Sequence, residues 1–317
     1  MDLAVLPAPR GGLTAPAGLV TTLHGRTMGT IWTVKIGGLC PAPAAVRSAI
    51  VARLGGLVAQ MSHWERESEI SRYNRAAAAT RVTIGEDFAA VMTCALSVAE
   101  LSGGAFDPAL GRAADQWGFG PRLNAIAPQG RGWRDLVLEG DTLLQPGGVQ
   151  LDLSGVAKGY AVDAVTALLE ERGLTSCLVE IGGEMFGTGL KPDGQPWWAQ
   201  IEPPGAVMKA RIMVALPGWG LATSGDYRRF HDHAGLRLSH TLDPVTGAPV
   251  RGELASVSVL AGDCMSADAW ATALTVLGEE EGAALADLHG LAALFLLRGD
   301  DGEIASRASA AWNELWA

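Results

Sequence analysis

The chain has 317 residues, of which 48% are hydrophobic and 18% charged, so it has ample material for a buried core and does not resemble a disordered protein. Its length allows one large domain or two closely packed domains. The 34 acidic and 24 basic side chains give a formal net charge of −10. An acidic chain without a basic run lacks the positive surface that binds nucleic acid or an anionic membrane. No apolar run approaches the ~18–20 residues of a membrane span.

The first 25 residues are rich in proline and glycine, and we expect them to be an irregular lead-in to one folded unit over residues 26–317. No basic residue precedes the first apolar stretch, and Pro7 and Pro9 interrupt it, which is unlike a secretory signal peptide. We therefore expect a cytoplasmic protein, with the periplasm as the alternative.

The first half of the folded unit begins with alternating side chains that predict a strand over 30–36. Apolar residues then recur every three or four positions, which predicts helices over 43–61 and about 86–102. Gly103 and Gly104 end the second helix. A turn-rich stretch over 118–132 precedes short strands expected near 135–151.

The second half alternates apolar strands and helices without a regular repeat. Leu151–Leu153 is expected to be a strand that leads into a helix ending at Gly173. Further strands are predicted at 177–181, 197–201, 211–216, 255–261 and 292–297, with a helix over about 266–277. This irregular order predicts a mixed α/β (α+β) fold, a single unit with room for two lobes.

The common catalytic fingerprints are absent. The chain contains no G-x-x-x-x-G-K-[ST], no G-x-G-x-x-G that opens a helix and no G-x-S-x-G. A P-loop, an ordinary dinucleotide site and a hydrolase nucleophile elbow are therefore not supported.

The segment LDLSGVAKGYAVD, residues 151–163, carries the first set of polar residues at an expected helix start. Free N–H groups there suit an anion, Gly155 and Gly159 allow close backbone approach, and Lys158 adds a point charge for phosphate. The alternative is structural: Asp152 caps the helix and Lys158 lies on a solvated face.

Asp268 and Thr272 are four residues apart, so on a helix they share one face. A carboxylate, a hydroxyl and a backbone carbonyl form a set of hard oxygen donors that suits Mg²⁺. Taken alone, such a pair is more often two ordinary helix positions.

Two loops add a candidate base and a candidate stacking surface. His240 comes just before the turn Asp243-Pro-x-x-Gly247, where a histidine can accept a proton, although a structural histidine fits equally well. Trp64 follows the first helix and can stack on a flat ring, although ten tryptophans make a core or surface role the default.

Together and in this order, these segments resemble the ApbE family of FAD:protein FMN transferases. The matching segments run from about residue 26 to 278: Met28-Gly29-Thr30, MSHWERESEISRYN (61–74), GGAFDPALG (103–111), LDLSGVAKGYAVD (151–163), EIGGE (180–184), LATSGDYRRF (221–230), SHTLDPVTGAPV (239–250) and SADAWAT (266–272).

This resemblance implies an ApbE-type, tunnelling-fold-related two-lobed unit, with residues 26–317 as the transferase domain. It also implies a phosphotransferase-type enzyme that uses Mg²⁺ to move FMN from FAD to a threonine hydroxyl of an acceptor flavoprotein, releasing AMP. The family's acceptors carry a motif close to Asp-x-x-Thr-Gly-Ala-Thr, which is absent from this chain.

The resemblance also assigns roles to residues. It implies metal ligation by Asp268, Thr272 and the Gly155 carbonyl, and a catalytic base at His240. The implied FAD contacts are Met28, Trp64, Ala105, Phe106, Asp107, Asp152, Lys158 and Thr241. Two positions depart from the family pattern, because Trp64 stands where tyrosine is more usual and Thr241 where an aliphatic residue is common.

Two other functions use the same residues. Water in place of threonine would make the enzyme an FAD pyrophosphatase that yields FMN and AMP. A protein that only holds FAD for a partner complex would be a non-catalytic assembly factor. The metal pair and His240 favour catalysis, since a carrier needs neither.

Overall fold

The computed structural model describes residues 3–11, 13–122, 132–202, 211–225, 230–233, 236–299 and 303–316. Its framework is an eight-stranded antiparallel sheet with the strand order β16-β15-β14-β11-β8-β7-β3-β2. The strands are β2 (Val20–Thr27), β3 (Thr30–Gly37), β7 (Cys177–Ile181), β8 (Glu184–Thr188), β11 (Trp219–Gly225), β14 (Leu254–Ala261), β15 (Ala292–Arg298) and β16 (Ile304–Ala308).

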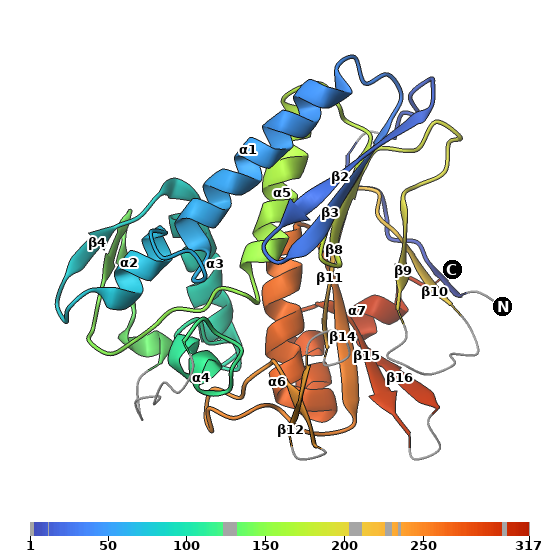
Figure 1. Ribbon diagram of the computed structural model, residues 1–317. Helices are drawn as coiled ribbons and strands as arrows, with labels where there is room; N and C mark the ends of the chain where they lie inside the picture. The colour runs from blue at the N-terminus through green and yellow to red at the C-terminus, as the bar shows by residue number, and fades with distance from the viewer. Residues whose placement is uncertain are drawn as a thin grey trace.

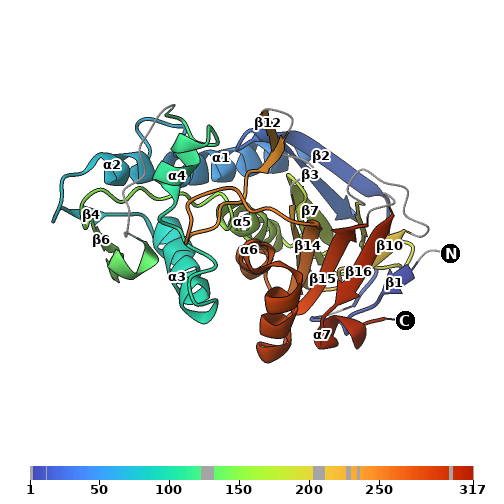
Figure 2. The same ribbon diagram turned by 90° about the horizontal axis from the view of Figure 1, so that it is seen from below.

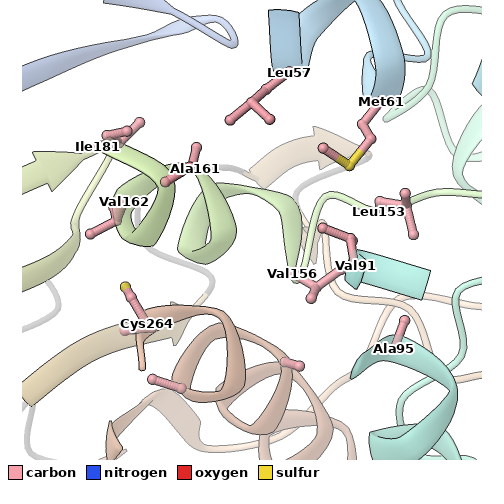
Figure 3. Packing of buried hydrophobic residues seen from close by; sticks show 14 of the residues in the cluster. Leu57, Met61, Val91, Ala95, Leu153, Val156, Ala161, Val162, Ile181 and Cys264 are labelled. Atoms are coloured by element: carbon pink, nitrogen blue, oxygen red, sulfur yellow. The ribbon is translucent and has the colours of Figure 1, made fainter. Parts of the chain in front are cut away.

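Three long helices lie against one face of this sheet, α1 (Pro43–Met61), α5 (Ala157–Glu170) and α6 (Cys264–Leu288) (Figure 1). α3 (Glu86–Leu101) packs behind α6 and α1. The apolar stripe of α1 is Val46, Ile50, Leu54, Leu57 and Met61, all buried. Figure 3 shows Leu57 and Met61 of this stripe facing side chains of α5 and α3, so the main core lies between the helices and the sheet.

The other face of the sheet is covered by a small sheet with the order β1-β10-β9, made of β1 (Leu3–Val5), β10 (Ile212–Ala215) and β9 (Trp198–Ile201). A second apolar cluster fills the space between the two sheets, with Trp197, Leu294 and Trp312 at its centre. α7 (Ala310–Asn313) completes this side near both chain ends (Figure 2).

A smaller lobe extends from the helical side of the sheet (Figure 1). It contains α2 (Glu69–Arg75), α4 (Gly111–Gln116), a 3-10 turn (Trp133–Asp135) and a sheet of β4 (Arg81–Thr83), β6 (Thr142–Leu144) and β5 (Val137–Glu139). A separate hairpin pairs β12 (Phe230–His233) with β13 (Leu236–Ser239). The mixed α/β prediction is confirmed. In the part of the chain that the structure describes, no helix has the length and apolar character needed to cross a membrane.

Two predicted elements need correction, and a third is only partly described. The N-terminal lead-in is not irregular throughout, because β1 pairs with β10 and β2 begins at Val20. The predicted helix over 266–277 falls in the first half of α6, which begins at Cys264 and continues to Leu288 across a kink at Gly278 (φ 78°). The predicted turn-rich stretch over 118–132 lies partly outside the described residues.

Leu151–Leu153 is extended but belongs to no strand. The amide side chain of Asn74 takes the place of a neighbouring strand, because its Nδ2 donates to the Leu151 carbonyl (3.0 Å) and its Oδ1 accepts from the Leu151 N–H (2.7 Å). The Asp152 N–H donates to the Pro108 carbonyl (2.9 Å). Both backbone groups of Leu151 and the Asp152 N–H are therefore satisfied without a strand ladder.

Candidate functional site

A pocket of about 360 Å³ opens where the helical face of the large sheet meets the smaller lobe. Parts of the chain that are distant in sequence line it, among them the β2–β3 turn, the loop before α4, the start of α5, the β7–β8 turn, the end of β11 and the first half of α6. Its volume and its mixture of apolar and polar walls suit a small-molecule site.

The pocket collects most of the residues that the sequence singles out. Its lining includes Ala105, Phe106, Asp107, Asp152, Gly155, Lys158, His240, Thr241, Asp268 and Thr272. Met28 and Trp64 are not part of that lining. Met28 packs on the main core in a left-handed turn (φ 48°) whose next residues, Gly29 and Thr30, do line the pocket. Trp64 is 63% exposed.

Close contact between α5 and α6 builds the floor of the pocket. A Cβ added to Gly159 would meet the Cys264 carbonyl oxygen at 2.3 Å, so only glycine permits this approach. The carboxylate of Asp163 accepts from the N–H groups of Cys264 and Met265, each at 2.8 Å, and so fixes the start of α6 beside α5. Burial raises the pKa of Asp163 to about 7.

Asp268 is buried on the first half of α6, and its Oδ2 accepts from the Gly159 N–H at the start of α5 (3.0 Å). The anion at this helix start is therefore a side chain of the protein itself. Burial raises the pKa of Asp268, and the positive charge of Lys158 opposes that rise.

Lys158 lies between two buried carboxylates. Its Nζ donates to Glu184 Oε1 and lies 4.0 Å from Asp268 Oδ1. The structural alternative for this segment is thus wrong on both points, because Lys158 is paired in the pocket and Asp152 accepts from the Ser154 N–H (2.9 Å) instead of capping α5.

Thr272 lies one helical turn after Asp268 and faces the same pocket. A Cβ added to Gly155 would meet Thr272 Oγ1 at 2.7 Å, so the bare backbone at Gly155 leaves room for that hydroxyl. Ser224 at the end of β11 shares a hydrogen bond with it, with 3.1 Å between the two Oγ atoms. The Asp268 carboxylate and the Thr272 hydroxyl are hard oxygen donors next to the Gly155 backbone, a set that fits Mg²⁺.

The loop before α4 forms one wall. Asp107 Oδ1 accepts from the Ala109 N–H (2.7 Å) and Oδ2 from the Trp133 N–H (3.2 Å), so both oxygens hold the loop in place. Burial raises the pKa of Asp107. Phe106 in the same wall is almost fully buried.

His240 and Thr241 come from the segment after β13. The ring of Phe119 lies edge-on to the His240 ring, with 6.5 Å between centroids. Thr241 is 7% exposed, and its N–H donates to Ser239 Oγ (3.1 Å). Residues 226–229, which include Asp226 and Tyr227 of the segment LATSGDYRRF, lie outside the described residues.

Sequence reasoning gave no role to three neighbours of the predicted residues. Glu184 binds Lys158, Ser224 binds Thr272, and His63 Nδ1 lies 3.5 Å from Asp152 Oδ1. His63 also contacts the ring of Trp64, with centroids 5.7 Å apart, and so connects that exposed ring to the pocket wall. The signal for Glu184 was its place directly after the Gly182-Gly183 turn.

Comparison with known proteins identifies the family of the chain. The ApbE family model matches residues 28–295. The FAD:protein FMN transferases of Vibrio cholerae and Klebsiella pneumoniae are 35% and 33% identical to the chain, over 88% and 95% of it and 88% and 89% of their own lengths.

Solved structures show the same likeness. The Pseudomonas stutzeri flavinyl transferase ApbE in its apo form superposes with a TM-score of 0.85 at 37% identity, covering 94% of this chain and 96% of that one. The flavin transferase ApbE of Vibrio cholerae gives 0.82 at 33% identity, covering 93% and 99%. The chain therefore belongs to the ApbE family.

Proposed function

We propose that the protein is an FAD:protein FMN transferase that uses Mg²⁺ to move FMN from FAD to a threonine hydroxyl of an acceptor flavoprotein. The observation that carries this proposal is the floor of the pocket, where Lys158, Asp268, Thr272 and Gly155 come together. The names of the relatives supply the substrate and the product class.

In this reaction the threonine Oγ forms a bond to the phosphorus of the FMN half of FAD. The bond from that phosphorus to the bridging oxygen breaks, and AMP leaves with the bridging oxygen. Negative charge grows on the phosphate oxygens and on the leaving group, so the site must supply positive charge.

Asp268, Thr272 and the Gly155 carbonyl would hold Mg²⁺, which acts as a Lewis acid toward the phosphate oxygens when bound. Lys158 brings a second positive charge to the same floor, and its pairing with Glu184 keeps the ammonium group in place.

His240 is proposed as the base that accepts the proton of the threonine hydroxyl as the Oγ–phosphorus bond forms. It lines the same pocket as Lys158 and Asp268. A positioned base contributes about 10²–10⁴-fold to such a step. The FAD contacts of Met28, Trp64, Asp107, Asp152 and Thr241 are part of the same proposal.

The test is intact-mass spectrometry of an acceptor domain that carries Asp-x-x-Thr-Gly-Ala-Thr, incubated with the protein and FAD in Mg²⁺ or in chelator. We expect a mass gain of one FMN moiety only with Mg²⁺, and none on an acceptor whose modified threonine is replaced by valine. AMP should appear in equal amount.

Two other outcomes would replace this proposal. AMP release without acceptor, at the rate seen with acceptor, would identify an FAD pyrophosphatase. Tight FAD binding with no AMP and no mass gain on a proven acceptor would identify a carrier.

A further inference from the structure

Ser224 occupies a position in the sheet that only the folded chain reveals. It lies at the end of β11, a strand that packs against α6. Because side chains alternate along a strand, Ser224 shares the α6 face with Ala222, which belongs to the main core. Thr223 lies on the opposite face and pairs with Ser258 of β14, with 2.8 Å between their oxygens.

Which of the two hydroxyls donates in the Ser224–Thr272 hydrogen bond decides whether Thr272 has a lone pair free for a metal ion. A hydroxyl has one proton and two lone pairs, so a hydroxyl that gives a lone pair to a cation must point its proton elsewhere. Either hydroxyl of this pair can donate, and Ser224 Oγ, 3.1 Å from Thr272 Oγ1, is within reach to accept that proton.

The backbone of Gly155 limits the space around the Thr272 side chain. A Cβ there would lie 2.7 Å from Thr272 Oγ1 and 3.2 Å from Cγ2, so the backbone of Gly155 already stands close to the threonine side chain. A hydroxyl held between a close backbone and a fixed acceptor has little rotational freedom left to lose when it binds a cation.

We propose that Ser224 is a positioning residue for the metal site: it accepts the proton of the Thr272 hydroxyl and so directs a lone pair of Thr272 toward the cation. This inference rests on the proposed function, since it takes Thr272 and Asp268 as the metal ligands. Partners of metal ligands typically contribute 10–100-fold to metal affinity or activity.

The experiment measures Mn²⁺ binding to the full-length protein by electron paramagnetic resonance of free Mn²⁺. We expect Ser224→Ala to weaken Mn²⁺ binding about 10-fold. Ser224→Thr keeps the hydroxyl and should restore affinity to within about two-fold.

Ser258→Ala is the matched control, because it removes the same group from the hydroxyl pair on the other face of the sheet. A loss of stability alone would affect both alanine variants, whereas the proposed role affects Mn²⁺ affinity only in Ser224→Ala. Thermal unfolding of both variants monitors the structural cost.

Asp268→Ala separates this inference from the proposed function. If Asp268→Ala loses Mn²⁺ binding while Ser224→Ala binds as the wild type does, the metal site stands and the role of Ser224 is overturned. If Asp268→Ala binds Mn²⁺ normally, the metal site is elsewhere, and if the wild type does not bind Mn²⁺, the proposed metal site does not exist. In either case the proposed metal ligands and the role of Ser224 both fail. Equal weakening by Ser258→Ala would also overturn the role of Ser224.

Discussion

Two clusters of polar and charged side chains each include a residue from the first turn of α5, Lys158 in one and Tyr160 in the other, and they differ in how completely their hydrogen-bonding groups are satisfied. Tyr160 belongs to the first cluster, in which the carboxylate of Asp87 accepts from Arg53 (2.6 and 2.5 Å), Gln60 (3.0 Å) and Tyr160 (2.5 Å). Lys158 belongs to the second cluster, with Glu184 and Asp268.

The second cluster lines the pocket and has bonding capacity left over. Among the described residues, Glu184 Oε2 is buried and has no hydrogen-bond partner, and such an atom is costly unless something binds near it. Both oxygens of Asp87 are used. A completed cluster stabilises the fold, whereas an incomplete one next to a pocket is suited to a ligand, and the two can be separated by substitution.

Removing Asp268 should have the largest effect. In Asp268→Ala we expect metal-dependent FMN transfer to fall at least ~100-fold, because a carboxylate ligand is worth several kcal/mol in stabilising developing charge. Transfer is followed by intact mass of the acceptor, and near-native thermal unfolding shows that the variant is folded. Undiminished transfer would place the metal elsewhere.

Adding one methyl group at Gly155 tests how closely Thr272 is packed on the pocket floor beside the second cluster. Gly155→Ala should reduce transfer about 10-fold or more, because its Cβ would lie 2.7 Å from Thr272 Oγ1 and displace that hydroxyl. Gly55→Ala in α1 is the matched control, since its Cβ meets nothing within 4 Å. It should leave transfer unchanged and stabilise the fold by ~0.5–1 kcal/mol. Equal activity of the two variants would contradict the crowded site.

The completed cluster should affect stability and not catalysis. The hydrogen bond from Arg53 lowers the pKa of Asp87 from 3.8 to about 2, so its stabilisation is present above pH 4 and is lost as the pH falls through 2. We expect Asp87→Asn to lower the free energy of unfolding by about 1 kcal/mol at pH 7, after allowance for partial exposure.

Urea unfolding at a series of pH values measures this difference, which should shrink toward zero near pH 2. Transfer activity of Asp87→Asn should stay within two-fold of the wild type. A loss comparable to that of Asp268→Ala would show that the two clusters act together.

The smallest expected effect is at Trp64, which belongs to neither cluster. Because the ring is 63% exposed, Trp64→Ala should change stability by less than ~0.5 kcal/mol. Loss of stacking should weaken FAD binding by roughly two- to ten-fold, and Trp64→Phe should recover most of it. Fluorescence titration with FAD measures both, and an unchanged affinity in Trp64→Ala would remove this residue from the site.

Periodicity was enough to predict the helices and strands that bury one apolar face. The stripe from Val46 to Met61 predicts α1 with its observed bounds. Leu151–Leu153 has the composition of a strand, but its partner is the amide of Asn74, 77 residues away, and no local pattern encodes such a contact. The sequence does not predict the extension of α6 past Gly278, because a glycine at that point is typical of a helix end, and the structure shows that the helix resumes after it.

In the site, too, local motifs are predictable from the sequence, whereas contacts between distant segments are not. Motif order predicted Asp152, Lys158, Asp268 and Thr272, which do line one pocket. Glu184 and Ser224 could not be given roles, because their partners depend on how the β7–β8 turn and the end of β11 meet α5 and α6. A carboxylate or hydroxyl acquires its role from the side chain opposite it, and that neighbour is a property of the tertiary structure.

The kink at Gly278 divides α6 into two segments that have different neighbours. The first segment carries Asp268 and Thr272 and is fixed by contacts with α5 and β11, while the second follows a residue whose backbone is not helical. In a straight helix a shift at one end displaces the other end, whereas a kink can absorb part of such a shift. The second segment still buries Gly282, Ala283 and Ala286, so sequence variation that leaves the pocket undisturbed is confined to its exposed positions, such as Glu280, Glu281 and Ala284.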